Sequence, residues 1–228
     1  MIENLIPQAS TYADDIDQLM ILVTLIVGFW YVGTKAMFFW LLYRFRAKEG
    51  VPAQYVTGKE PHLKRWITIP HGLIILCDVV IIVGAVKVWH HVKLELPPAQ
   101  ETVHIIAQQW AWTFVHPGPD GDIETEEDNI TTIDELHVRN NTLYHYKLTS
   151  KDVLHDFSVP VFRLKQDALP GREIMGWFEP TLLGAYDLQC AEMCGIGHGI
   201  MSAMVYVESK EEHDAWMQFM TANQVAAQ

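Results

Sequence analysis

Residues 19–43 read LMILVTLIVGFWYVGTKAMFFWLLY, and residues 67–89 read ITIPHGLIILCDVVIIVGAVKVW. A helix needs about 20 apolar residues to cross a bilayer, and both runs reach that length. We therefore expect two membrane-spanning helices, at about residues 17–45 and 66–91. Two buried helices of a soluble core would be the alternative, but core helices are seldom apolar over such a length.

The segment between the two runs holds most of the basic residues of the first 95 positions: Arg44, Arg46, Lys48, Lys59, Lys64 and Arg65. Residues 1–18 contain no Lys or Arg. Because loops rich in Lys and Arg stay on the cytoplasmic side of a membrane, residues 1–95 are expected to form a hairpin with both termini on the opposite side. In a bacterial plasma membrane, this puts the C-terminal domain in the periplasm.

Two charged residues, Lys35 and Asp78, lie well inside the apolar runs. An ionisable side chain within the bilayer either faces another membrane protein or extends its charged end to the surface. Both explanations stay open, and the first implies a larger membrane partner.

The acidic character of the chain is concentrated after the hairpin. The 228 residues carry a net charge of −12, and from Glu95 onward 21 Asp and Glu stand against 7 Lys and Arg. Phosphate recognition requires Lys and Arg, so no nucleic-acid partner is expected. Such a charge either keeps a domain soluble or attracts a basic partner.

Residues 96–228 have the sequence pattern of a small β domain. Short runs rich in Val, Ile, Tyr, Thr and Trp alternate with turns such as residues 117–121 and 140–141. Regularly spaced strands of this kind are typical of a sandwich or barrel. Ser209 and Glu212 form a capping-box pattern that predicts a short C-terminal helix. The expected fold class is therefore mainly β, with a two-helix transmembrane hairpin in front.

Residues 190–201 read CAEMCGIGHGIM, and they bring together two thiols, an imidazole and a thioether, those of Cys190, Cys194, His198 and Met201. Soft sulfur donors combined with imidazole favour copper, particularly in a redox role. A disulfide between the two cysteines would leave His198 and Met201 unexplained, and so short a loop strains the disulfide geometry. A structural zinc site has no use for Met, and a c-type haem needs Cys-x-x-Cys-His.

This arrangement resembles the CuA loop of cytochrome c oxidase subunit II, and the resemblance extends over nearly the whole chain. Other segments agree with that family in order and spacing: Val153-Leu154-His155 ahead of Val159-Pro160, Leu164 to Arg172, Gln109 to Trp112, and Trp66 with Pro70. The resemblance implies a cupredoxin-like Greek-key β-sandwich as the C-terminal domain. It also implies a function: accepting electrons from cytochrome c and passing them to the haem of subunit I, where oxygen is reduced to water.

The resemblance further implies a set of metal ligands. The family's dinuclear copper centre would be held by His155, Cys190, the backbone carbonyl of Glu192, Cys194, His198 and Met201. The two thiolates would bridge both coppers. The side chain of Glu192 would bind a magnesium ion shared with subunit I. The implied partners are subunit I, other membrane subunits, membrane lipid, and a soluble or membrane-bound cytochrome c.

Trp110 resembles the tryptophan at which this family takes up electrons from the donor. An ordinary core or interface tryptophan is the alternative. A group of acidic residues could attract a basic cytochrome c, or could form a solvated loop: Asp120, Asp122, Glu124, Glu126, Glu127 and Asp128, with Asp152 beside the segment of His155.

The chain departs from the family pattern at Leu63, where a glutamate near a proton path is usual, and at Ala111, where a tyrosine is usual. Neither position is a predicted copper ligand. Leu63 keeps an alternative open, namely the CuA-bearing subunit of a nitric oxide reductase of the same superfamily. A quinol oxidase subunit would lack the copper ligands, and a copper chaperone would have a more exposed, incomplete set.

Overall fold

The computed structural model describes residues 5–53, 55–125 and 128–226, and the chain separates into two compact units. One unit is Asp17–His91, which contains most of the two long helices. The other, called the sandwich unit below, joins the residues up to Ile16 with Val92 and all that follow.

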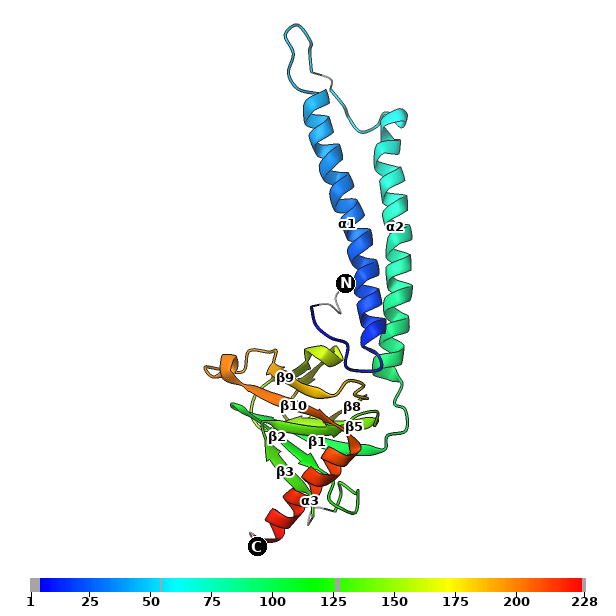
Figure 1. The fold of residues 1–228 in the computed structure, drawn as a ribbon. Coiled ribbons are helices and arrows are strands. Elements are labelled where there is room, and N and C mark those ends of the chain that lie inside the picture. The colour runs from blue at the N-terminus through cyan, green and yellow to red at the C-terminus, as the bar shows by residue number, and fades with distance from the viewer. Residues whose placement is uncertain (1–4, 54, 126–127, 227–228) are drawn as a thin grey trace. The chain divides into compact units, whose positions relative to one another are not determined.

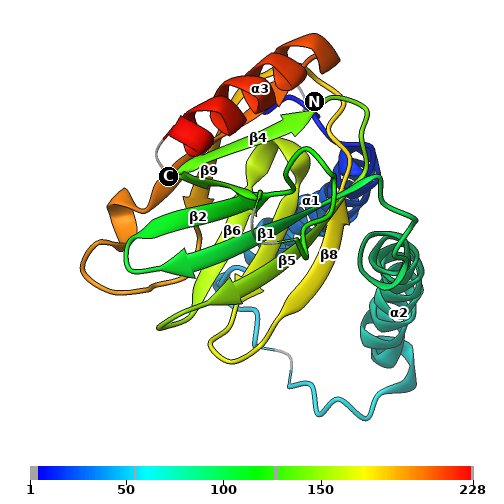
Figure 2. The same cartoon turned by 90° about the horizontal axis from the view of Figure 1, so that it is seen from below.

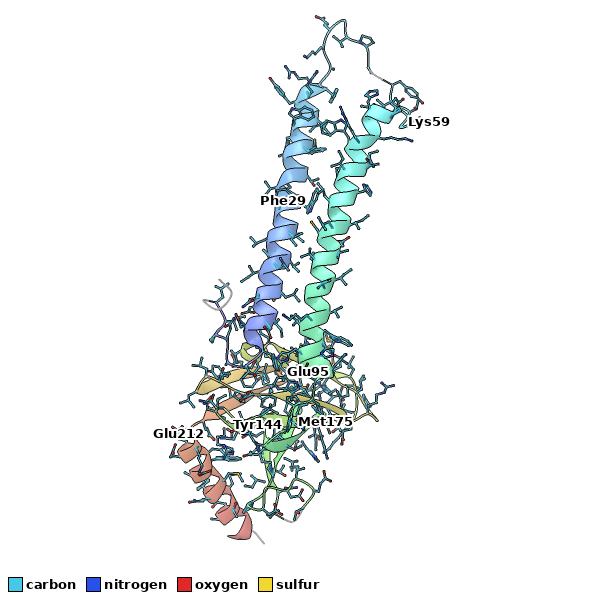
Figure 3. The ribbon with its side chains drawn as sticks, turned by 90° about the vertical axis from the view of Figure 1, so that its right-hand side faces the viewer. Phe29, Lys59, Glu95, Tyr144, Met175 and Glu212 are labelled. Carbon is cyan, nitrogen blue, oxygen red and sulfur yellow. The ribbon has the colours of Figure 1, made fainter. Side chains whose placement is uncertain are left out.

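Two long helices, α1 (Ala13–Arg44) and α2 (Pro61–Trp89), correspond to the two apolar runs. Both are long and apolar enough to cross a membrane. Side chains project from all sides of them, as Figure 3 shows around Phe29, and α2, which is described in full, has no buried residue. The second helix begins earlier than expected, because proline is favoured in the first turn of a helix. A π-helical turn, His90–Leu94, follows it.

The sandwich unit consists of two five-stranded sheets (Figures 1 and 2). The first sheet contains, in spatial order, β3 (Ile130–Ile133), β2 (Ala111–His116), β1 (Glu101–Gln108), β5 (Tyr144–Ser150) and β8 (Ile174–Phe178). The second contains β4 (Glu135–Arg139), β10 (Ser202–Glu208), β9 (Gly184–Cys190), β6 (His155–Val159) and β7 (Leu164–Ala168). Neighbouring strands are antiparallel except for two parallel pairs, β1 with β5 and β4 with β10.

The core lies between the sheets and follows the alternation of the strands. In β1, Val103, Ile105 and Ala107 are buried, while the residues between them are half-buried. A period of two is what a strand with one buried face requires. Trp112 and Phe157 meet in this core with their ring centroids 5.6 Å apart. The prediction of two apolar N-terminal helices followed by a mainly β, cupredoxin-like sandwich is confirmed.

A short segment ahead of α1 packs into the sandwich unit. Ser10 forms a β-bridge with Pro180, and its hydroxyl donates to the carbonyl of Phe162 over 2.8 Å. Tyr12 is fully buried, and its ring stands edge-on to Trp177 with the centroids 5.0 Å apart. This contribution of the N-terminus to the core was not predicted, because the segment is too short to carry a strand pattern of its own.

The C-terminal helix α3 (Lys210–Ala226) lies along β4, as Figure 2 shows. Its first turn carries the predicted capping box: the Ser209 backbone N–H donates to the Glu212 carboxylate over 2.9 Å, and the Glu212 N–H donates to the Ser209 hydroxyl over 3.2 Å. Trp216 then stacks on His137 of β4, with the ring centroids 4.2 Å apart.

Candidate metal centre

Separate chain segments bring potential metal ligands to one rim of the sandwich unit. Cys190 ends β9, Met201 directly precedes β10, and the loop between them, visible in Figure 1, carries Cys194 and His198. His155 opens β6, which pairs with β9. The strand pairing therefore joins the first predicted ligand to the loop that holds the others.

The tightest group of donor atoms belongs to His155, Cys190 and Cys194, which lie within 4.8 Å of one another and are all buried. The Cys190 Sγ is 3.9 Å from the His155 Nδ1 and 3.8 Å from the Cys194 Sγ. The Met201 Sδ is 3.1 Å from the same imidazole nitrogen and 3.8 Å from the Cys194 Sγ. Four donor atoms therefore surround one small volume.

The two remaining predicted donors also reach the sulfurs. The His198 Nδ1 lies 3.7 Å from the Cys194 Sγ. The backbone carbonyl oxygen of Glu192 lies 3.2 Å from the Cys190 Sγ. The structure thus brings all six predicted donors together, with the two cysteine sulfurs in the middle.

Both cysteines are free thiols. Burial, followed by the hydrogen bond and charge of Cys190, raises the pKa of Cys194 to about 11. The metal-free Cys194 therefore keeps its proton at neutral pH. A metal binds the thiolate form, so loading the site releases protons.

The chemistry of the donors suits copper. Metal–sulfur bonds of about 2.3 Å allow two sulfurs 3.8 Å apart to bind the same ion, whereas a disulfide would need a far shorter separation. Thiolate, thioether and imidazole together favour copper over the harder ions, which prefer oxygen ligands. The buried His/Cys cluster therefore points to copper binding.

Asp152 holds the first histidine in place. Its carboxylate accepts a hydrogen bond from the His155 Nε2 over 2.8 Å, which leaves the Nδ1 facing the sulfurs. The backbone N–H groups of Gln109 and Val153 donate to the same carboxylate, each over 2.7 Å. Burial acts to raise the pKa of Asp152, but these three hydrogen bonds outweigh it, and the pKa is lowered. The sequence had suggested this residue only as a surface acid.

Trp110 lies directly against the ligand loop. Its indole N–H donates to the carbonyl of Cys194 over 3.4 Å, and the Gln109 side chain donates to the same oxygen over 2.7 Å. A Cβ atom at Gly197 would lie 2.4 Å from the indole, and Gly195 adopts a φ of +123°, which disfavours any other residue. These glycines allow the ring to rest on the loop while 37% of Trp110 stays exposed.

Carboxylates gather beside the loop on the side of β6 and β7. The half-exposed Glu192 carboxylate lies 3.9 Å from the Lys165 Nζ. Burial, followed by a hydrogen bond with Asp167, raises the pKa of Asp156 to about 7, and the charge of Glu192 adds to the effect. Asp156 was not singled out from the sequence, although it directly follows His155.

The acidic stretch after β2 starts at the far end of the sandwich unit, and its Glu124 pairs with Lys147, which lies opposite His104 in the middle of β1. Strand β2 starts next to Trp110 and ends at His116, where Pro117 and Gly121 line a cavity with Glu101 at the start of β1. The eight residues of β1 separate that cavity from the Trp110 end by about 23 Å, at roughly 3.3 Å per residue. Figure 1 shows this β2–β3 connection away from the β9–β10 loop. Glu126 and Glu127 of the stretch lie outside the described residues.

Comparisons with known proteins agree with this arrangement. Residues 101–208 match the family described as cytochrome c oxidase subunit II, periplasmic domain. The alternative cytochrome c oxidase subunit 2 of Bradyrhizobium diazoefficiens is 31% identical over 221 residues, covering 86% of this chain and 78% of the relative. The probable cytochrome c oxidase subunit 2 of Rickettsia bellii is 32% identical over 174 residues, covering 71% of this chain and 62% of the relative.

A solved structure has the same fold. The crystal structure of the periplasmic domain of subunit II of cytochrome oxidase from Bradyrhizobium japonicum superposes with a TM-score of 0.50 and 26% sequence identity. The superposed region covers 57% of this chain and 99% of that domain.

Proposed function

The chain belongs to the cytochrome c oxidase subunit II family, and from that premise we propose that it is the electron-accepting subunit of a terminal oxidase. It takes electrons from cytochrome c at a dinuclear CuA centre and passes them to the haem of subunit I, where oxygen is reduced to water. The observation that carries this proposal is the convergence of six donor groups on two buried sulfurs.

Each donor has a definite place in the proposed centre. Cys190 and Cys194 would be ligands of both coppers, since their sulfurs are the atoms that every other donor approaches. His155 and Met201 would supply the remaining ligands of one copper, and His198 with the carbonyl oxygen of Glu192 would supply those of the other. When bound, such a pair of metals supplies a one-electron carrier whose charge is spread over both ions.

The protein's contribution is rigidity and exclusion of water. His155, Cys190, Cys194 and Met201 are all buried, and strands β6, β9 and β10 fix three of them at their ends. Ligands that cannot move require little rearrangement when the charge of the centre changes by one. The surrounding apolar shell and the hydrogen bond that His155 donates to Asp152 tune the potential.

We assign Trp110 as the place where electrons arrive. Its ring is partly exposed on one side and hydrogen-bonded to the carbonyl of the ligand Cys194 on the other. This geometry supports a short path from a docked donor to the copper site.

The carboxylate of Glu192 is assigned to a magnesium ion shared with subunit I. In support, Glu192 turns its backbone carbonyl toward the sulfurs, while its half-exposed carboxylate lies at the surface, 3.9 Å from the Lys165 Nζ. Carboxylate oxygens are the ligands that magnesium prefers.

The two apolar helices anchor the subunit in the inner membrane beside subunit I and other membrane subunits. The basic loop between the helices supports a cytoplasmic position for residues 45–60 and a periplasmic position for the sandwich unit.

The test is oxygen consumption by the assembled oxidase with reduced cytochrome c as donor. Cys190→Ser should abolish the cytochrome c-dependent oxygen uptake, because a bridging sulfur is lost. Cys77→Ser is the matched control, since Cys77 lies in α2 and should be dispensable for turnover. Full oxygen uptake by Cys190→Ser would refute the proposal. Consumption of nitric oxide instead of oxygen by the native complex would favour the reductase alternative that Leu63 leaves open.

A further inference from the structure

Gln109 and Trp110 form the two-residue turn between β1 and β2. The paired residues Gln108 and Ala111 flank this turn on its two sides. Antiparallel pairing that continues right up to a two-residue connection leaves the connection little freedom. The Gln109 side chain therefore starts from a rigid base, although the residue itself is exposed.

The side chain of Gln109 reaches the loop that carries the candidate ligands. Its Nε2 donates to the backbone carbonyl of Cys194 over 2.7 Å, whereas the Trp110 indole lies 3.4 Å from the same oxygen. A Cβ atom at Gly195 would lie 2.9 Å from the Gln109 Nε2, so glycine at this position leaves room for the amide. The loop is shaped to receive the Gln109 side chain.

This hydrogen bond is one of few that join the middle of the loop to the sheets. Within the described part of the chain, the remaining hydrogen bonds of residues 193–200 stay inside residues 190–201. Without the Gln109 amide, the hydrogen bonding of Cys194 to the sheets would depend on the longer and weaker indole contact.

The backbone of Gln109 reaches the other side of the candidate centre. Its N–H donates to the Asp152 carboxylate over 2.7 Å, and the same carboxylate accepts from the His155 Nε2 over 2.8 Å. The two ends of one residue therefore connect the loop of Cys194 with the strand end that carries His155.

We propose that Gln109 is a positioning residue of the metal centre, which holds Cys194 and His155 at the spacing that an evenly shared electron requires. This inference rests on the proposed function and adds a residue outside the six donors. When the side-chain donor is lost, the loop shifts while Asp152 still holds His155. The two metal positions then have unequal surroundings, and the electron is shared unequally.

The first variant is Gln109→Met, which keeps the length of the side chain and removes its N–H donor. The full-length chain is purified in detergent, loaded with copper and measured by electron paramagnetic resonance. The native chain should show equal coupling to two copper nuclei, and Gln109→Met should show two different couplings. Excess EDTA should also remove copper from the variant roughly threefold to tenfold faster, as the loss of one hydrogen bond predicts.

A second variant, Gln109→Glu, separates the hydrogen bond from the shape of the side chain. The glutamate side chain has nearly the same size, but an ionised carboxylate only accepts hydrogen bonds. A residue that merely fills space would tolerate this change. A positioning hydrogen bond predicts unequal coupling in Gln109→Glu, as in Gln109→Met.

Gln189→Met is the matched control. Gln189 is exposed and directly precedes the candidate ligand Cys190, so the same chemical change is made beside the centre. Coupling should stay equal, and copper loss should change less than about twofold. Because Gln109 and Gln189 are both exposed, all three variants should fold, and near-ultraviolet circular dichroism checks this.

The outcomes separate the two proposals. Equal coupling in either folded Gln109 variant, with copper loss within about twofold of the native rate, would overturn the inference. The proposed function would then stand, since the native chain would still hold two coppers that share one electron. A native chain that binds no copper, or a single copper, would overturn both.

Discussion

Among single residues, the contact between Asp152 and His155 has the most direct influence on the candidate centre. The carboxylate accepts from the imidazole Nε2 over 2.8 Å, and this fixes both the tautomer and the orientation of the ring. Two backbone N–H groups hold the carboxylate in turn. A ligand anchored in this way has only one nitrogen, Nδ1, to offer a metal.

Asp152→Asn should raise the reduction potential of the copper centre by tens of millivolts, because removing a nearby negative charge disfavours the more positive, oxidised state. Copper content should stay at the native level. A redox titration of the full-length chain followed by optical absorption measures the potential. Asp120→Asn, at the far end of the sandwich unit, is the control and should leave it unchanged. An unchanged potential in Asp152→Asn would show that the charge of Asp152 does not tune the site.

The role of Asp152 could not be predicted from the sequence. Its position three residues before His155 is visible, but the direction of its carboxylate depends on the Gln109 N–H, which comes from a distant turn. The donors of residues 190–201 were easier to find, because four of them lie in one loop. His155 was found only through a family resemblance, since it reaches the loop by strand pairing.

Among the elements, α3 is attached to the sheets of the sandwich unit by a cluster of polar and aromatic side chains. His137 and His213 both approach the Glu208 carboxylate, at 2.8 and 3.1 Å. The Trp216 ring stacks on His137 and meets His116 edge-on, with centroids 5.0 Å apart. The three histidines come from β2, β4 and α3, so their sequence spacing gives no sign that they meet.

His116 gives this cluster a defined pH dependence. Burial, followed by the charges of His137 and His213, lowers the pKa of His116 to about 3. The His116 imidazole therefore binds a proton more readily in the unfolded chain than in the folded one. The stability that comes from keeping His116 neutral is fully present above the pKa of the unfolded chain, about 6.5. It is lost as the pH falls toward the pKa of His116 in the folded chain, about 3.

His116→Phe keeps an aromatic ring beside Trp216 and removes the titration. Between about pH 6.5 and 3, the free energy of unfolding of the native chain should fall by up to about 1.4 kcal/mol per pH unit more than that of the variant. Urea unfolding of α3 and the sandwich, followed by tryptophan fluorescence at several pH values, measures the difference. Protonation of the metal ligands affects both proteins alike. Parallel pH profiles would contradict a buried neutral His116.

Over the whole molecule, the sandwich unit is not a continuous piece of the chain. The residues before α1 close part of its core through Tyr12, and the rest begins only at Val92. The sequence division at residues 95 and 96 stays a prediction. Hydropathy locates both apolar helices well, but it cannot show that a polar segment ahead of the first helix packs into a domain that begins after the second.

Tyr12→Ala should destabilise the sandwich unit by about 3 kcal/mol, as truncation of a large buried aromatic side chain does. The melting temperature of the sandwich should fall by roughly 5–10 °C. Near-ultraviolet circular dichroism of the full-length chain during heating measures this change. Tyr55→Ala is the control, since Tyr55 is 90% exposed. Equal melting temperatures for the two variants would contradict a structural role for the N-terminal segment.

Copper stoichiometry, combined with electron paramagnetic resonance of the full-length, copper-loaded chain in detergent, tests the proposed centre most directly. Six donors around two sulfurs should hold two coppers per chain, with one unpaired electron coupled equally to both copper nuclei. Cys190→Ser should lose that signal. One copper per chain, with the electron coupled to a single nucleus, would contradict a dinuclear site formed by His155, Met201 and the loop between Cys190 and His198.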